Sequence, residues 1–214
     1  MGAISRFELQ GIPPELTLAL VEQVRLQGPG RLALVGGAVR DALRHQLHGA
    51  SWQGLPDLDL VLEGSCSAVA LGLQQRLGTE RVSWLQLHER YGTAELRLDG
   101  VLIDLAGARQ ERYPAPGENP VVQPGPLDQD LARRDFTVNA MALVLQGDGS
   151  QQLLDPHGGL NHLASQQLVF LHDGSVADDP TRVIRAARYG ARLGFELDSG
   201  SLQQLQTTLE RWPW

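Results

Sequence analysis

Two aspartates in one short apolar segment are the first residues whose type and spacing could do chemistry. Asp57 and Asp59 lie two positions apart in the segment Pro-Asp-Leu-Asp-Leu-Val. Side chains repeat every two residues along a β-strand, so a strand here would present both carboxylates on one face. Two close carboxylates repel each other unless a cation lies between them, and oxygen ligands of this kind, with substrate phosphates, suit Mg²⁺. A strand with one solvated face would show the same spacing.

A third acid, Asp104, stands alone in the apolar segment Val-Leu-Ile-Asp-Leu-Ala-Gly. A single acid in such a strand often lies at the strand end, in water. It would instead be a third metal ligand if its strand paired beside the strand that carries Asp57 and Asp59. Phosphoryl transfer with two metal ions uses such a cluster, with the ions roughly 3.5–4 Å apart.

A glycine pair follows a strand-like segment in Leu-Val-Gly-Gly-Ala-Val-Arg-Asp, residues 34–41. Gly36 and Gly37 would let a ligand approach the backbone closely. The helix that begins there would offer free N–H groups to a phosphate. Arg40 and Asp41 fall in the first turn of that helix or just beyond it. The same residues could form nothing more than a tight strand-to-helix turn.

A second charged group, in residues 131–143, reads Leu-Ala-Arg-Arg-Asp-Phe-Thr-Val-Asn-Ala-Met-Ala-Leu. Guanidinium groups bind phosphate with two hydrogen bonds, so Arg133 or Arg134 could clamp a triphosphate. Adjacent arginines point in different directions on a helix, which leaves one of them for a structural role. Asp135 and Asn139 lie beside them. A solvated charge cluster is the alternative interpretation.

A third charged group follows in residues 178–195, Asp-Asp-Pro-Thr-Arg-Val-Ile-Arg-Ala-Ala-Arg-Tyr-Gly-Ala-Arg-Leu-Gly-Phe. Its four arginines, Arg182, Arg185, Arg188 and Arg192, are spaced by three, three and four residues. This spacing places them on one side of a helix. Composition alone favours a salt-bridged helix, although the same side could bind a nucleic acid or a single ligand.

Composition narrows the classes of function. The chain has 214 residues, a net charge of -7 and one cysteine. General nucleic-acid binders are usually basic, so any such role here must be local. All 18 basic residues are arginines, which excludes a Walker A loop, a protein kinase and a Schiff-base enzyme, because each needs a lysine. We expect no membrane span and no signal peptide, and therefore a cytoplasmic protein.

Hydrophobic periodicity predicts the elements that must position these residues. Helices are expected over 14–27, 38–47, 65–77, 127–133, 137–142 and 179–193, and from about 200. Strands are expected over 31–35, 57–63, 81–87, 92–98, 101–107, 143–146 and 152–154. Asp99-Gly100 between two strands is a strong hairpin signal, and the segment 109–126, rich in proline and glycine, is expected to be a loop. The pattern indicates a mixed α/β domain followed by the start of a helical region.

The order of these motifs is more specific than any one of them. The glycine pair with Arg-Asp, then Asp-x-Asp, then Arg-Arg-Asp-x-x-x-Asn-Ala, then Asp-x-x-Arg-x-x-Arg-x-x-Arg resembles bacterial class II tRNA nucleotidyltransferases. This family contains CCA-adding enzymes and the related bacterial poly(A) polymerases. The similarity runs from about Leu32 to Phe195 and includes the segments Tyr-Gly-Thr-Ala-Glu-Leu and Ile-Asp-Leu-Ala-Gly-Ala-Arg.

The resemblance implies a polymerase-β-like head with a mixed sheet of about five strands, followed by a helical neck. We expect the head over residues 1–172 and the start of the neck over 173–214, without the body and tail that follow in the family. Asp57 and Asp59 would be catalytic and would hold Mg²⁺ in a two-metal site, with Asp104 as the candidate third ligand. Asp179 and Arg182 would recognise the base of CTP or ATP. The full expected nucleotide site is Gly36, Gly37, Arg40, Arg134, Asp135, Asn139, Asp179, Arg182, Arg185 and Arg188.

The implied activity is addition of CMP and AMP from CTP and ATP to the 3′ end of tRNA. CCA addition is favoured over poly(A) synthesis because no basic Gly-Arg-Arg-Phe-like stretch follows the Asp-x-Asp strand. Four alternatives stay open: a CC-only or A-only adding enzyme, a poly(A) polymerase, a nucleotidyltransferase with a small acceptor, and a non-catalytic nucleotide-binding head. The sequence departs from the family pattern by an insertion around residues 43–54 and by its short length, and it leaves the oligomeric state open.

Overall fold

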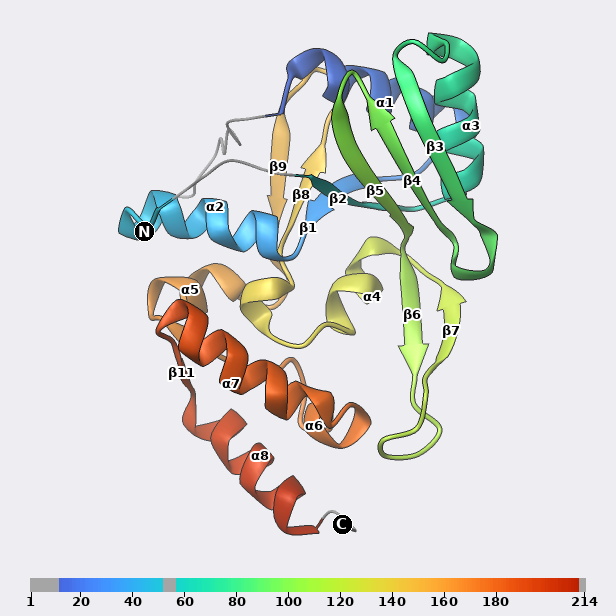
Figure 1. Cartoon of the computed structure of the whole chain (residues 1–214). Coiled ribbons are helices and arrows are strands. Elements are labelled where there is room, and N and C mark those ends of the chain that lie inside the picture. Colours follow the sequence, from blue (N-terminus) through green and yellow to red (C-terminus); the bar gives the residue numbers. More distant parts are fainter. Residues whose placement is uncertain (1–11, 52–56, 212–214) are drawn as a thin grey trace.

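A seven-stranded mixed sheet forms the centre of the molecule (Figure 1). The structure is a computed structural model that describes residues 12–51 and 57–211. The strand order is β3-β4-β5-β2-β1-β8-β9. The strands are β1 (Leu32–Val35), β2 (Leu58–Leu62), β3 (Val82–His88), β4 (Thr93–Leu98), β5 (Val101–Gly107), β8 (Ala142–Leu145) and β9 (Gln151–Leu154). Only β2 and β5 pair in parallel among the described strands of this sheet. The α/β class is thus confirmed, but the sheet is wider than the expected five strands.

Helices cover the sheet and extend from it. They are α1 (Pro14–Gln27), α2 (Gly37–His48), α3 (Cys66–Leu77), α4 (Leu127–Ala132), α5 (Gly159–Ala164), α6 (Ser175–Asp178), α7 (Thr181–Leu193) and α8 (Ser199–Arg211). Two short 3-10 helices, η1 (Glu89–Tyr91) and η2 (Thr137–Asn139), also occur. Figure 1 shows α1 and α3 on the sheet, and α7 and α8 at the opposite end of the molecule from them.

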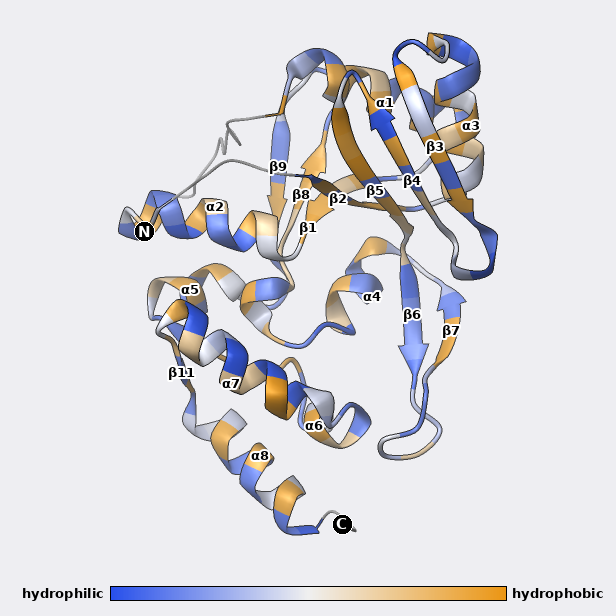
Figure 2. Cartoon of the chain, viewed as in Figure 1, coloured by the Kyte–Doolittle hydropathy of each residue, from blue (hydrophilic) through white to orange (hydrophobic). Residues whose placement is uncertain are grey.

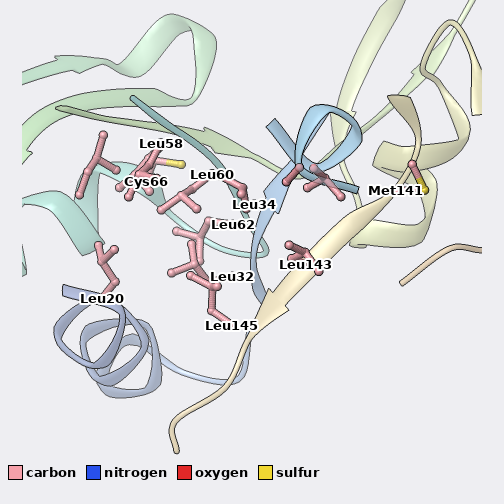
Figure 3. Close-up of a cluster of buried hydrophobic side chains, with 14 of the residues drawn as sticks. Leu20, Leu32, Leu34, Leu58, Leu60, Leu62, Cys66, Met141, Leu143 and Leu145 are labelled. Carbon is pink, nitrogen blue, oxygen red and sulfur yellow. The ribbon is translucent and has the colours of Figure 1, made fainter. Parts of the chain in front are cut away.

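Side-chain alternation divides the core between the two faces of the sheet. The leucines of β1 and β2 pack with α1 and α3 in the larger buried cluster, part of which is drawn in Figure 3. Residues that alternate with them, such as Ala33, Val35 and Val61, pack with α4 in a smaller cluster. Cys66 belongs to the larger cluster, and burial raises the pKa of its thiol to about 11. The confirmed alternation in β2 is what turns Asp59 towards the α4 side.

The larger cluster continues without a break into the C-terminal helices. Phe170, Val176, Ala186 and Phe195 belong to the same group of buried side chains as the sheet leucines. The parallel strands β10 (Gln167–Leu168) and β11 (Glu196–Leu197) pair with each other and bring the end of α7 back to this region. A head–neck division at residue 172 stays a prediction, and it falls inside this continuous packing.

Two segments differ from their expected structure. The expected loop 109–126 contains a two-stranded hairpin, β6 (Arg109–Arg112) and β7 (Val121–Pro124), with the proline- and glycine-rich residues at its tip. The helix expected over 137–142 shrinks to η2, because the apolar residues that follow enter the sheet as β8. Figure 2 shows the contrast: β8 is largely hydrophobic, whereas β6 and one side of α7 are hydrophilic.

The insertion expected around residues 43–54 is only partly visible. Residues up to His48 extend α2, and residues 52–56 lie outside the described part of the chain. The described ranges contain no helix long and apolar enough to cross a membrane.

Candidate functional site

A cleft of about 930 Å³ opens between the sheet, the glycine turn, the segment around α4 and η2, and the start of α7. Its walls include most of the side chains whose types suggested chemistry. The expected site residues that line it are Gly36, Gly37, Asp59, Asp104, Arg134, Asp135, Asn139, Asp179, Arg182 and Arg185. Segments more than a hundred residues apart in the sequence therefore meet around one volume.

Strand pairing brings the acids together. Asp59 and Asp104 are direct register partners in the parallel pair of β2 and β5. Glu95 on β4 is in turn the partner of Asp104. Partial burial and then the charge of Asp57 raise the pKa of Asp59, against an opposing effect of Arg134. Burial, Glu95, Asp59 and Asp57 raise the pKa of Asp104. The fold thus holds these negative charges close together, and their repulsion and burial lower the stability of the folded state.

These donors fit a hard divalent cation, because they are all carboxylate oxygens and a cation would relieve their repulsion. No three acidic, histidine or cysteine side chains form a ready metal cage within residues 12–51 and 57–211. Mg²⁺ typically binds through one or two carboxylates and completes its shell with phosphates and water. Asp57, just before β2, is half-buried and does not line the cleft.

Arg134 lies beside the glycine turn. Gly36 has a φ of 70°, and a Cβ built on it would lie 3.2 Å from Nη1 of Arg134. Nη2 of Arg134 donates to Asp130 Oδ2 at 2.9 Å, while its buried Nε has no hydrogen-bond partner among residues 12–51 and 57–211. The first turn of α2 adds backbone N–H groups that lack helical partners. A guanidinium with spare donors beside a helix N-terminus is suited to bind the phosphates of a ligand.

Asp130 fixes the direction of both adjacent arginines. Its fully buried carboxylate accepts hydrogen bonds from Arg133 Nη2 at 2.7 Å and from Arg134 Nη2 at 2.9 Å. Arg133 also donates from Nη1 to Glu111 at 3.0 Å. The guanidinium of Arg133 is therefore shared by two acids, which makes it the structural member of the pair, and Arg134 is the one with donors to spare.

Asp179 and Arg182 stand together at the start of α7. Oδ1 of Asp179 accepts hydrogen bonds from the backbone N and hydroxyl of Thr181, at 3.0 and 2.6 Å. The buried Arg182 donates from Nη2 to the carbonyl of Arg133 at 2.7 Å and from Nη1 to the carbonyl of Ser175 at 3.3 Å. Nε of Arg182 lies 3.9 Å from Asp179 Oδ2. Thr181 thus holds the Asp179 side chain from two residues away, and two backbone carbonyls, one of them 49 residues distant, hold that of Arg182.

Three expected site residues are not in the cleft wall. Asp57 is one. Arg40 is buried under the glycine turn, where it donates to Asn139 and Asp41, so direct contact with a nucleotide is not indicated by its position. Arg188 is exposed on α7 and does not line the cleft.

Sequence reasoning missed four side chains that shape the cleft. Glu95 extends the row of acids, and Asp130 and Glu111 orient arginines. Tyr113 donates from its hydroxyl to Glu111 at 3.2 Å and lines the cleft. For Asp130 a signal existed, because arginines three and four residues later lie on the same side of a helix. Glu111 reaches its partner across 22 residues, so no local pattern could reveal it.

Comparison with known proteins agrees with this geometry. Residues 32–169 match the protein family described as the poly A polymerase head domain. The CC-adding tRNA nucleotidyltransferase of Deinococcus radiodurans is 46% identical over 171 residues, covering 79% of this chain and 43% of that protein. The A-adding tRNA nucleotidyltransferase of Aquifex aeolicus is 38% identical over 176 residues, covering 82% of this chain and 20% of that protein.

A solved structure of a CCA-adding enzyme, in its apo form II, superimposes with a TM-score of 0.78 at 31% identity. The similarity covers 93% of this chain and 45% of that one. This chain therefore spans less than half the length of each of the three proteins. The matches confirm the resemblance that the order of motifs indicated.

Proposed function

Because the chain belongs to the poly(A) polymerase head-domain family, we propose that it is the catalytic head of a template-independent RNA nucleotidyltransferase. It transfers CMP or AMP from CTP or ATP to the 3′ end of tRNA. Residues up to 172 form the head in this proposal, and the helices after it begin the neck. The named relatives include both CC-adding and A-adding enzymes, so both nucleotides are candidates.

The observation that carries the proposal is the convergence of three kinds of group on one cleft. Paired carboxylates, a phosphate-binding turn with Arg134, and the Asp179–Arg182 pair all border its volume of about 930 Å³. Pockets for small ligands and cofactors measure roughly 300–1,000 Å³. A nucleoside triphosphate has three parts that suit these three groups: the reacting phosphate, the phosphate tail and the base.

Each part of the chain then has a role in the reaction. The glycine turn and Arg134 bind the triphosphate, and Asp179 and Arg182 hydrogen-bond to the Watson–Crick edge of the base. The RNA 3′-hydroxyl attacks the α-phosphate, and pyrophosphate leaves. Mg²⁺ held by Asp57 and Asp59, with Asp104 beside them, would lower the pKa of the hydroxyl and neutralise phosphate charge. The protein contributes position and electrostatics, and no covalent intermediate forms.

The test is incorporation of labelled CTP and ATP into a tRNA that lacks its 3′ end, in the presence of Mg²⁺. We expect incorporation by the unaltered chain and a loss of at least about a hundredfold with Asp57→Ala and Asp59→Ala together, since electrostatic groups at the reacting centre contribute on this scale. Asp99→Ala, in an exposed ion pair with Arg81, is the control and should leave the rate unchanged. Equal incorporation by the double variant would refute the metal assignment.

A second candidate is a head that binds nucleotides without turning them over, which the position of Asp57 outside the cleft wall favours. Calorimetry with CTP, ATP, GTP and UTP separates the two. A preference for CTP or ATP without incorporation supports the second candidate. Absence of binding to all four contradicts both.

A further inference from the structure

Two ion pairs connect helix α7 to the rest of the molecule, one in its first half and one near its C-terminal end. Arg185 donates from Nε to Asp135 Oδ2 at 2.7 Å. Seven residues later, Arg192 donates from Nη2 to Asp41 Oδ2 at 3.0 Å. Seven residues are close to two helical turns, so both arginines leave the same side of α7. The carboxylates that receive them come from two different segments, one beside η2 and one in α2.

Hydrogen bonds between buried groups connect these two carboxylates. Oδ1 of Asp135 accepts from Nδ2 of Asn139 at 2.9 Å, and Oδ1 of Asn139 accepts from Nη1 of Arg40 at 2.5 Å. Arg40 then donates from Nε and Nη2 to the two oxygens of Asp41, at 2.8 and 2.9 Å. The contacts close into a ring that leaves α7 and returns to it. Its six members are Arg185, Asp135, Asn139, Arg40, Asp41 and Arg192, and we call them the α7 ring.

The aromatic side chain of Tyr189 contacts two members of the α7 ring. The guanidinium carbons of Arg40 and Arg185 lie 5.1 and 5.8 Å from the ring centre of Tyr189. The aromatic ring of Phe136 packs edge-on against that of Tyr189, with centroids 5.8 Å apart. Cations over an aromatic face are attracted by its negative quadrupole, and more strongly when they are desolvated. Tyr189 therefore joins the two halves of the α7 ring through its face.

The α7 ring links the two ends of the candidate nucleotide site. A Cβ built on Gly37 would lie 3.3 Å from Nη2 of Arg40, so the ring lies directly under the phosphate-binding turn. At its other side the ring holds α7, which carries Arg182 in its first turn and begins two residues after Asp179. We propose that Asp41 and Arg192 are positioning residues that hold α7 at a fixed distance from the glycine turn. This inference rests on the proposed function for its consequence, which is the spacing between phosphate and base.

The proposal depends most on Arg192, one of the four arginines whose spacing in the sequence predicts a shared side of one helix. Its side chain is 54% exposed and that of Asp41 is 27% exposed. An exposed pair changes an equilibrium by roughly fivefold at most, so the expected effects are modest. Loss of the pair should nevertheless affect the glycine turn, because Asp41 also accepts two hydrogen bonds from the buried Arg40 beneath that turn.

Two measurements on Arg192→Ala test the link. Amide hydrogen exchange, recorded without nucleotide, should become roughly three- to fivefold faster in residues 36–42 as well as in α7. The dissociation constants of CTP and ATP should rise by a similar factor, while far-UV circular dichroism stays unchanged. Arg192→Lys keeps the charge and should restore most of both values.

Matched variants distinguish a specific link from general loosening. Arg81→Ala breaks an ion pair with Asp99 that is also partly exposed and lies away from the cleft. It should change neither the hydrogen exchange of residues 36–42 nor the nucleotide affinity. If Arg192 acts through Asp41, then Arg192→Ala should add nothing in an Asp41→Asn background.

Each outcome has a defined meaning. Faster exchange confined to α7, or effects of Asp41→Asn and Arg192→Ala that add in full, would overturn the link. If exchange is transmitted to residues 36–42 but the unaltered chain binds no nucleotide, the link stands and the proposed function fails. If CTP or ATP binds and no exchange is transmitted, the proposed function stands and the link fails.

Discussion

At the scale of single residues, the cleft depends on buried acids that aim basic side chains. Asp130 is the clearest example, because one fully buried carboxylate receives both Arg133 and Arg134. A buried charge is tolerable only when it is paired and hydrogen-bonded, and removing one partner leaves the other uncompensated. The direction of Arg134 towards the glycine turn is thus set by a residue that no ligand needs to touch.

Replacement of Asp130 should therefore cost both stability and nucleotide binding. We expect Asp130→Ala to lower the free energy of unfolding by about 3–5 kcal/mol, the cost of breaking a buried ion pair. Urea denaturation measures it, and CTP affinity of the folded fraction should fall as well. Asp128→Ala in the same helix removes an acid that is 52% exposed and should cost less than about 1 kcal/mol. Equal costs for the two variants would contradict the assigned role.

At the scale of elements, the strand-to-helix connection between β1 and α2 brings the backbone within reach of Arg134. Gly36 has a positive φ of 70°, which side chains rarely adopt, and the space beside it is occupied by the Arg134 guanidinium. A glycine is thus favoured at position 36 for two separate reasons: its positive φ, and the close approach of the Arg134 guanidinium to its backbone.

A matched pair of glycine variants separates those requirements. Gly36→Ala and Gly149→Ala both force alanine into a positive φ, at a cost of roughly 1–3 kcal/mol each. A Cβ at Gly149 meets nothing within 4 Å, whereas one at Gly36 meets Arg134. Both variants should lose stability in thermal unfolding, and only Gly36→Ala should also lose CTP and ATP affinity by calorimetry. Unchanged affinity in Gly36→Ala would argue against a phosphate site at this turn.

The sequence was most informative where a long periodic pattern matched one element. Strands β1, β2, β4 and β5 and helices α1, α3 and α7 were predicted from such patterns, and the Asp99-Gly100 hairpin from its turn residues. Helix α5 and strands β10 and β11 were not predicted, because they are short and their pairing depends on segments that meet only in the fold. The helix expected at 137–142 gave way because its second half pairs in the sheet.

The candidate site shows the same limit. Motif order located ten cleft residues, but the sequence could not tell that Arg40 is buried and Arg188 exposed. Both carry the charge and position expected of a ligand-binding arginine. Neither lines the cleft, and Arg40 is held beneath it by Asn139 and Tyr189, which come from other elements than α2.

At the scale of the whole molecule, the acidic side chains of the sheet that line the cleft reduce the free energy of unfolding. Burial and like charges raise the pKa of Asp59 and Asp104 above their ordinary values. A raised acid pKa means that the folded chain takes up a proton more readily than the unfolded chain does. The loss of stability caused by these carboxylates is thus fully present above the raised pKa values, and it disappears as the pH falls through them.

Asp104→Asn should accordingly stabilise the protein near pH 7, because it removes the unfavourable charge. The gain in free energy of unfolding should shrink as the pH is lowered towards about 4, the ordinary pKa of an aspartate. Urea denaturation across this range, without divalent ions, measures it. Asp99 provides a control of opposite sign, because Arg81 lowers its pKa, so Asp99→Asn should give no stabilisation at pH 7. A gain for Asp104→Asn that is equal at both pH values would contradict this account.

The continuous buried cluster between the sheet and the C-terminal helices limits how the cleft can change its width. Moving α7 away from the sheet would uncover buried side chains at its C-terminal end, such as Leu193 and Phe195, which are each 4% exposed. Each such side chain costs roughly 1.5–3 kcal/mol to expose. The separation between α7 and the sheet should therefore stay nearly constant when a ligand enters the cleft. A pyrimidine and a purine would have to be accommodated by adjustment of side chains at the rim of the cleft, without movement of α7.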